Sequence, residues 1–187
     1  MKFLILFFFS LPCFAKVHIE PYVGYGFTIM SQDQITKDLV NDIGESIDFF
    51  IDGKKYENKV AGIRLGYRSI GLGLGVDLSI AQWAAISGSE TLTPITSGLF
   101  ASYNLPLLFR VYGVFIPMAR VFAGTLEENS TASDICDQSH GIKAGLSYLS
   151  IPFLSINFEY QSLYIGGDSQ ICGSWANSGS VYLNFMF

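Results

Sequence analysis

Apolar and polar residues alternate with a period of two over several long segments of this sequence. The clearest segments are 17–29, 61–67, 72–80, 142–148, 154–160 and 181–187. Successive side chains of a strand point to opposite faces, so this period predicts β-strands with one apolar face and one more polar face. Less regular segments at 95–103 and 109–123 bring the expected number of strands to about eight.

The composition narrows what such strands can build. Half of the residues are hydrophobic and 14% are charged, and the mean hydropathy is +0.37. No segment after the N-terminus approaches the roughly 20 continuous apolar residues that a membrane-spanning helix needs. The strands therefore form either a dense soluble core or a closed barrel with a lipid-facing outer wall, the only other structure that spans a membrane.

The N-terminal segment has the pattern of a secretory signal peptide. Lys2 supplies a positive charge, the residues from Phe3 to Leu11 are apolar, and Cys13-Phe14-Ala15 offers a small-residue cleavage site. The alternative is a buried N-terminal strand or helix. We expect a signal peptide over residues 1–15, cleaved after Ala15, followed by one domain over residues 16–187.

The expected connections between strands alternate in length. The links near 69–71, 104–107 and 150–152 are short, whereas the links near 31–58, 84–92, 125–140 and 165–178 are longer and polar. Short turns at one end and long loops at the other are typical of outer-membrane barrels. The predicted fold is an all-β, up-and-down antiparallel transmembrane β-barrel of about eight strands.

The chain resembles the small outer-membrane β-barrel family, the OmpA-type transmembrane domain and its eight-stranded relatives. The resemblance covers residues 16–187 and rests on the opening strand VHIEPYVGYGF, the glycine-rich second and third strands, and the strand VYLNFMF. It implies a location in the bacterial outer membrane, contact with outer-membrane lipid, and insertion by the barrel-assembly machinery. Leu183, Phe185 and Phe187 resemble the assembly signal that this machinery reads. The chain has no room for a periplasmic peptidoglycan-binding domain, so that function is not implied.

Charged residues of the strands are expected on the inner, polar face, with none on the apolar face. The proposed lumen network is Glu20, Arg64, Arg68, Asp77, Arg110, Arg120, Lys143 and Glu159. Charges in a narrow interior must pair. We expect Glu20 and Asp77 to pair with Arg64 or Arg68, and Glu159 with Lys143 or Arg110. The network is either a packed plug, which we favour, or a salt-bridge gate of a small pore.

Glycines and aromatic residues have expected places as well. Gly62 and Gly75 are among the inner-face glycines that would make room for larger side chains from across the lumen. The aromatic residues at the strand ends are expected in interfacial girdles. These are Tyr67, Tyr103, Tyr148, Tyr160 and Trp83.

The long connections carry most of the 16 acidic residues. The first connection, residues 33–56, is expected to hold a short helix over 35–43 and a hairpin over 47–56. It is either a docking surface for an unknown partner or a solvated rim, which we favour. Cys136 and Cys172 are expected to form a disulfide between the third and fourth long connections. Metal binding is disfavoured, because no His or Cys partner lies at ligand spacing.

The sequence is compatible with several functions, which can be ranked. A structural or surface-interaction role is favoured, and a narrow small-solute channel is the second hypothesis. A lipid A-modifying enzyme would need Ser139 and His140, which are adjacent, whereas the related deacylase has one residue between its His and Ser. A soluble barrel with an internal ligand pocket would put the charges outside. We expect a monomer with no enzymatic activity, cofactor, metal or nucleic-acid partner.

Overall fold

The computed structural model describes residues 16–32, 54–106, 108–124, 134–151, 153–167 and 172–187. The expected signal peptide, the helix over 35–43 and most of the hairpin over 47–56 lie outside these residues. In the described part of the chain, no helix is long and apolar enough to cross a membrane.

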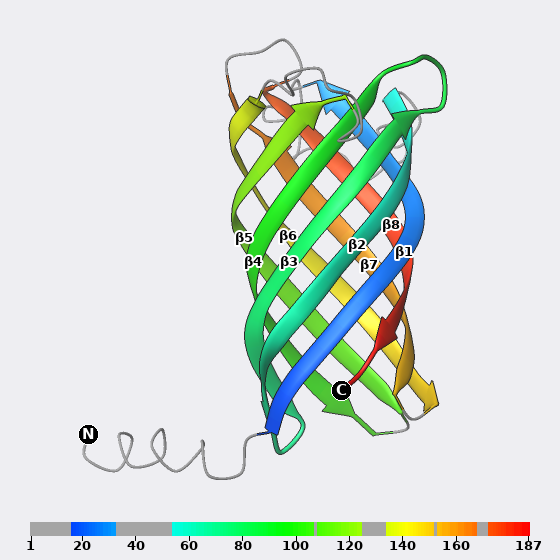
Figure 1. Cartoon of the computed structure of the whole chain (residues 1–187), viewed down its shortest axis with the longest axis vertical. Coiled ribbons are helices and arrows are strands. Elements are labelled where there is room, and N and C mark those ends of the chain that lie inside the picture. Colours follow the sequence, from blue (N-terminus) through cyan, green and yellow to red (C-terminus); the bar gives the residue numbers. More distant parts are fainter. Residues whose placement is uncertain (1–15, 33–53, 107, 125–133, 152, 168–171) are drawn as a thin grey trace, which may run out of the picture.

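The described residues form one closed barrel of eight antiparallel strands (Figure 1). The strands are β1 (Lys16–Gln32), β2 (Lys54–Ser69), β3 (Leu72–Ala85), β4 (Thr91–Leu105), β5 (Phe109–Ala123), β6 (Asp134–Ile151), β7 (Leu154–Ile165) and β8 (Ser174–Phe185). Each strand pairs with the next along the chain, and β8 pairs with β1. Beyond β8, the backbones of Phe187 and Ile19 exchange hydrogen bonds of 3.0 and 3.3 Å. The predicted fold and the pairing of the last strand with the first are confirmed.

The connections sort to the two ends of the barrel as expected. The short links after β2, β4 and β6 lie at the end that also holds the start of β1 (Figure 1); we call this the turn end and the opposite end the loop end. Between β2 and β3 only Ile70 and Gly71 intervene, with φ of 49° and 81°. Positive φ at both positions is the geometry of the tight hairpin turns whose twist matches that of the strands. The strands thus reverse with minimal exposed backbone at the turn end.

The outer wall is apolar over most of its height. Its exposed side chains include Phe27, Leu74, Leu99, Phe115, Phe158 and Val181. Tyr67, Tyr103, Tyr148 and Tyr160 also lie exposed on this wall, as expected of girdle residues. Trp83 does not, because it shares its side of β3 with Asp77 and is fully buried in the lumen. An apolar exterior around a polar interior reverses the order of a soluble barrel and fits a bilayer.

A bulge in β5 changes which of its side chains face the lumen. Ser97 and Leu99 of β4, two residues apart, pair with Met118 and Phe115, three residues apart. The extra residue lies next to Pro117, which cannot donate a backbone hydrogen bond. Beyond the bulge the alternation is inverted, so Arg120 is exposed on the outer wall. Its predicted place in the lumen, and the expectation of an outer wall without charges, are therefore wrong.

Candidate functional site in the barrel lumen

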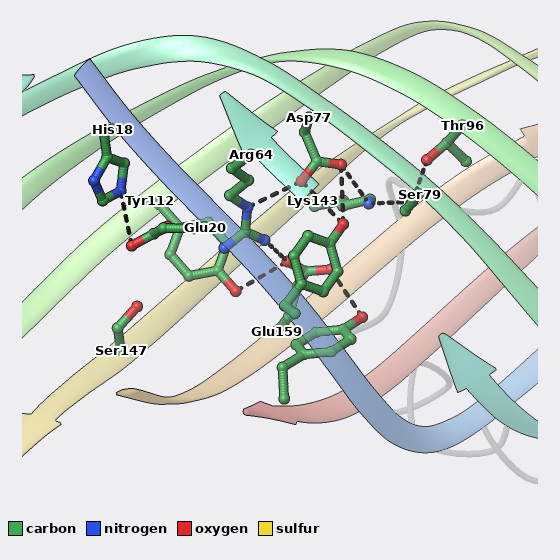
Figure 2. Close-up of polar contacts among 12 residues, drawn as sticks. His18, Glu20, Arg64, Asp77, Ser79, Thr96, Tyr112, Lys143, Ser147 and Glu159 are labelled. Carbon is green, nitrogen blue, oxygen red and sulfur yellow. Dashed lines mark hydrogen bonds and ion pairs between the residues drawn. The ribbon is translucent and has the colours of Figure 1, made fainter. Parts of the chain in front are cut away.

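A four-charge cluster crosses the middle of the lumen (Figure 2). Arg64 of β2 donates from Nε to Asp77 of β3 at 2.9 Å and from Nη2 to Glu159 of β7 at 2.7 Å. Its guanidinium carbon lies 4.1 Å from the ring centre of Tyr112 and 4.8 Å from that of Tyr22. Arg64 is 1% exposed. A guanidinium held by two carboxylates and two aromatic faces is fixed in position.

Lys143 of β6 closes the cluster from a third side. Its Nζ donates at 2.9 Å both to Asp77 and to the hydroxyl of Ser79. Ser79 in turn lies 2.6 Å from Thr96 of β4. Asp77, Glu159, Arg64 and Lys143 together carry no net charge. Buried charges without partners are costly, so this balance is what allows the cluster to lie in a closed interior.

Three tyrosine hydroxyls complete the cluster. Tyr22 donates to Asp77 at 3.0 Å, whereas Tyr112 and Tyr182 donate to Glu159 at 2.9 and 3.0 Å. Each tyrosine packs over a glycine of the adjacent strand, where a Cβ would lie within 2.4 Å of its side chain. The pairs are Tyr22 over Gly62, Tyr112 over Gly145 and Tyr182 over Gly24. Glycine thus provides the space that lets three large rings share a narrow barrel.

A second charge group lies toward the turn end. Glu20 of β1 pairs with Arg110 of β5, and lies 2.8 Å from Nε2 of His18 and 3.6 Å from Arg68. Arg68 also lies 3.0 Å from the same His18 nitrogen. Two arginines face one carboxylate here, so Arg68, Arg110 and Glu20 together carry an excess positive charge.

Several buried polar atoms near this second group have no hydrogen-bond partner among the residues that the structure describes. They include Nη2 of Arg110 and both amide atoms of Asn157 and of Asn184, whose side chains are at most 1% exposed. Buried polar groups of this kind are normally satisfied by ordered water. The polar part of the lumen is therefore suited to hydration at the turn end.

The loop-end half of the lumen contains a cluster of apolar side chains, beside buried polar residues such as Thr28, Asn58 and Ser178. Its fully buried side chains include Tyr56, Trp83, Leu92, Ile116, Val121, Leu163 and Ile165; we call them the apolar layer. Cys136 packs into the same cluster and is bonded to Cys172, 36 residues later. The predicted disulfide is confirmed. The apolar layer separates the charge cluster from the loop end.

The structure brings seven of the eight predicted network residues into the lumen and leaves Arg120 outside. Asp77 pairs with Arg64, one of its two predicted partners. The prediction that Glu159 pairs with Lys143 or Arg110 is wrong, because Glu159 pairs with Arg64 from across the lumen. The sequence reasoning missed His18, Tyr22 and Tyr182, although their even spacing from Glu20 and Asn184 places them on the same inner face.

The adjacent residues Ser139 and His140 face opposite sides of β6. Ser139 is 1% exposed in the lumen, whereas His140 is exposed and its ring lies 5.3 Å from that of Tyr164 at an angle of 47°. A nucleophile and its base must lie within hydrogen-bond reach on the same side. This pair is therefore not arranged for catalysis. Among the described residues, no group of three or more His, Cys, Asp or Glu side chains could hold a metal ion.

Comparison with known proteins reveals likeness in fold rather than in sequence. No family model and no curated protein sequence matches the chain. The crystal structure of Neisserial surface protein A (NspA) superposes with a TM-score of 0.57 at 14% identity, over 92% of this chain and 99% of that one. Ail, the attachment invasion locus protein of Yersinia pestis, superposes with a TM-score of 0.55 at 9% identity, with the same coverage. Closure, strand order and an apolar outer wall give this chain the fold of a small bacterial outer-membrane β-barrel.

Proposed function

We propose that this protein is a structural or surface-interaction barrel of the bacterial outer membrane, whose lumen is closed by its own side chains. The main observation behind this proposal is that two barriers, one charged and one apolar, follow one another along the lumen. The neutral Arg64–Asp77–Lys143–Glu159 cluster joins opposite walls, and the apolar layer lies between it and the loop end. An ion moving along the axis would have to break the first barrier and dehydrate in the second.

Conductance of the purified full chain in planar lipid bilayers tests this closure. We expect no single-channel steps above those of the bare membrane. Regular steps in the unsubstituted protein that change in Glu20→Ala or Arg64→Ala would instead establish the second candidate, a narrow small-solute channel. This candidate is favoured by the buried polar atoms of Arg110, Asn157 and Asn184 that have no hydrogen-bond partner among the described residues.

The surface-interaction part of the proposal concerns residues 33–56. Residues 33–53 lie outside the described residues, and Lys54–Tyr56 begin β2. The acidic residues of this segment favour a partner with a complementary positive surface. The names of two proteins of this fold, a surface protein and an attachment protein, are consistent with such a role. Cell-surface binding should fall when residues 33–53 are replaced by a Gly/Ser linker of equal length, while the folded barrel remains in the membrane. Unchanged binding would indicate that residues 33–56 form only a solvated rim.

Export and assembly complete the proposal. Residues 1–15 would direct export, and Leu183, Phe185 and Phe187, which share the outer wall of β8 and its extension, would be read by the barrel-assembly machinery. Deletion of Phe187 is expected to lower the amount of heat-modifiable barrel on unboiled gels more than a loop deletion of equal length. The proposal includes no catalysis, cofactor or nucleic-acid partner, and it describes a monomer whose outer wall contacts lipid.

A further inference from the structure

The two charge groups of the lumen differ in their balance. The four-charge cluster at mid-lumen is neutral, whereas the turn-end group sets two cations, Arg68 and Arg110, against the carboxylate of Glu20. His18, in the same group, adds a further positive charge whenever it is protonated. Arg110 and Glu20 are both 1% exposed, and an excess charge in such a closed interior is costly unless something offsets it. Among the described side chains, the turn-end group therefore lacks one negative charge.

No other carboxylate side chain among the described residues lies at the turn end. Asp77 and Glu159 belong to the mid-lumen cluster, and the remaining acidic residues lie near the loop ends of β2, β4 and β6. These are Glu57, Glu90, Asp134 and Asp137. The offsetting charge is therefore not supplied by a side chain of the described barrel.

The turn end of the lumen also holds buried donors without partners. Nη2 of Arg110 and Nε of Arg68 have no acceptor among the described residues, although each arginine also pairs with Glu20. The side-chain amides of Asn157 and Asn184 are likewise unpartnered within this part of the chain. Arg110, Asn157 and Asn184 are each at most 1% exposed. Buried donors that lack an acceptor in the protein indicate an ordered water or ion beside them.

The register of the strands brings these donors together. Ser147 of β6 lies opposite both Arg110 of β5 and Asn157 of β7, and it accepts a hydrogen bond of 3.3 Å from Arg110. Asn184 of β8 lies nearer the turn end, since its partner Ser155 is two residues from Asn157. Side chains that are directly opposite or diagonal on one face of neighbouring strands are within reach of one another. Arg110, Asn157 and Asn184 therefore face one small region of the lumen.

We infer that this region binds a single halide ion, chloride in the cell, which supplies the missing negative charge. The ion would accept hydrogen bonds from Nη2 of Arg110 and from the amides of Asn157 and Asn184. Because these donors lie among packed side chains, the ion has to be small. A water molecule would also satisfy the donors, but it would leave the excess charge in place, so the charge favours an anion.

The exposure of the two arginines indicates how such an ion would enter. The side chain of Arg68 is 22% exposed, whereas that of Arg110 is 1% exposed. The turn end is therefore the side from which the ion would reach Arg110. The inference goes beyond the closed lumen proposed above and is independent of any partner of residues 33–56.

Chloride-dependent stability of the full chain tests the inference. The barrel is refolded in lipid vesicles, and its urea unfolding is measured at one ionic strength while sodium gluconate is replaced stepwise by sodium chloride. An ion that binds only the folded barrel stabilises it. Once the site is saturated, each tenfold rise in chloride should therefore raise the folded-to-unfolded ratio about tenfold. Sodium bromide should act in the same way. Equal stability in gluconate and chloride would overturn the inference in favour of water.

Two charge variants have opposite expected results. Arg110→Met removes the excess cation and one donor, so the chloride dependence should disappear. Glu20→Gln retains both arginines and increases the excess positive charge, so the dependence should persist and begin at lower chloride concentrations. Asn184→Leu removes an amide and keeps every charge. It should weaken chloride binding by at least about tenfold, the size of one lost hydrogen bond to a charged group, and it carries the test if Arg110→Met does not fold.

Asn58→Leu is the matched control, because Asn58 is also a buried asparagine of the lumen but lies in its loop-end half. Its chloride dependence should equal that of the unsubstituted protein, and each variant must show the heat-modifiable gel shift of the folded barrel. The inference is overturned if Arg110→Met or Asn184→Leu retains the full dependence, or if Glu20→Gln abolishes it. It is also overturned if Asn58→Leu weakens the dependence as much as Asn184→Leu.

Discussion

The two halves of the lumen are filled by different kinds of interaction. From the middle to the turn end, charged and tyrosine side chains each need a particular partner, as Arg64 needs Asp77 and Glu159. At the loop end, the side chains of the apolar layer around Trp83 need only fill the available volume, and the disulfide at Cys136 adds a covalent link. The same period-two alternation encodes both halves. The difference shows that an inward position determines burial, whereas the residue type determines whether burial requires pairing.

The largest expected effect is in the charged half. Among the described residues, Arg64→Met leaves Lys143 as the cation beside Asp77 and takes from Glu159 its cation. Removal of one partner from a buried ionic group costs about 3–5 kcal/mol. Urea unfolding of the barrel in lipid vesicles should show this loss. The double variant Arg64→Met with Glu159→Gln should recover part of it, because Asp77 and Lys143 remain balanced. A double variant less stable than the single one would show that charge balance does not hold this half together.

A similar loss is expected in the apolar half, by a different mechanism. Trp83→Ala removes a fully buried ring and leaves a cavity, at a cost of about 3–5 kcal/mol in the same unfolding measurement. Trp83→Phe should cost much less, because it retains most of the volume and removes an Nε1 donor that has no partner in the described part of the chain. If Trp83→Phe cost as much as Trp83→Ala, this half would depend on a specific polar contact, and the contrast between the halves would fail.

The disulfide provides a third comparison. Replacing Cys136 and Cys172 together by Ser should lower the free energy of unfolding by about 2–4 kcal/mol, the usual effect of a loop of this length. Adding a reductant to the unsubstituted protein should give a similar loss, and adding it to the double variant should give none. Equal stability of the double variant and the oxidised protein would show that packing alone holds the loop end.

The smallest expected effect tests a single hydrogen bond in the charged half. Tyr182→Phe removes one donor to Glu159 and retains the ring over Gly24, so about 1.5 kcal/mol should be lost. Tyr67→Phe, on the exposed outer wall, is the control and should be close to neutral. A loss at Tyr182 as large as that of Arg64→Met would indicate that the hydroxyls, rather than the charges, dominate the cluster.

The fold was predictable because it depends on short-range pattern. The alternation in 17–29 and 72–80 determines which side of each strand is apolar, and the two-residue link Ile70-Gly71 determines where one hairpin turns. Most of the network could be predicted for the same reason, since parity alone places Glu20, Arg64 and Asp77 on one face. Arg120 could not, because a single extra residue near Pro117 inverts the parity beyond it.

By itself, the sequence determined the number of strands, the order of the connections and the inward or outward side of most side chains. These properties depend on neighbours within a strand and on the length of each link. Only the tertiary structure decided that Glu159 meets Arg64 across the lumen, and that Arg120 lies on the outer wall. Strand tilt and register bring residues from distant strands to the same height. Such contacts exist only once the barrel has closed.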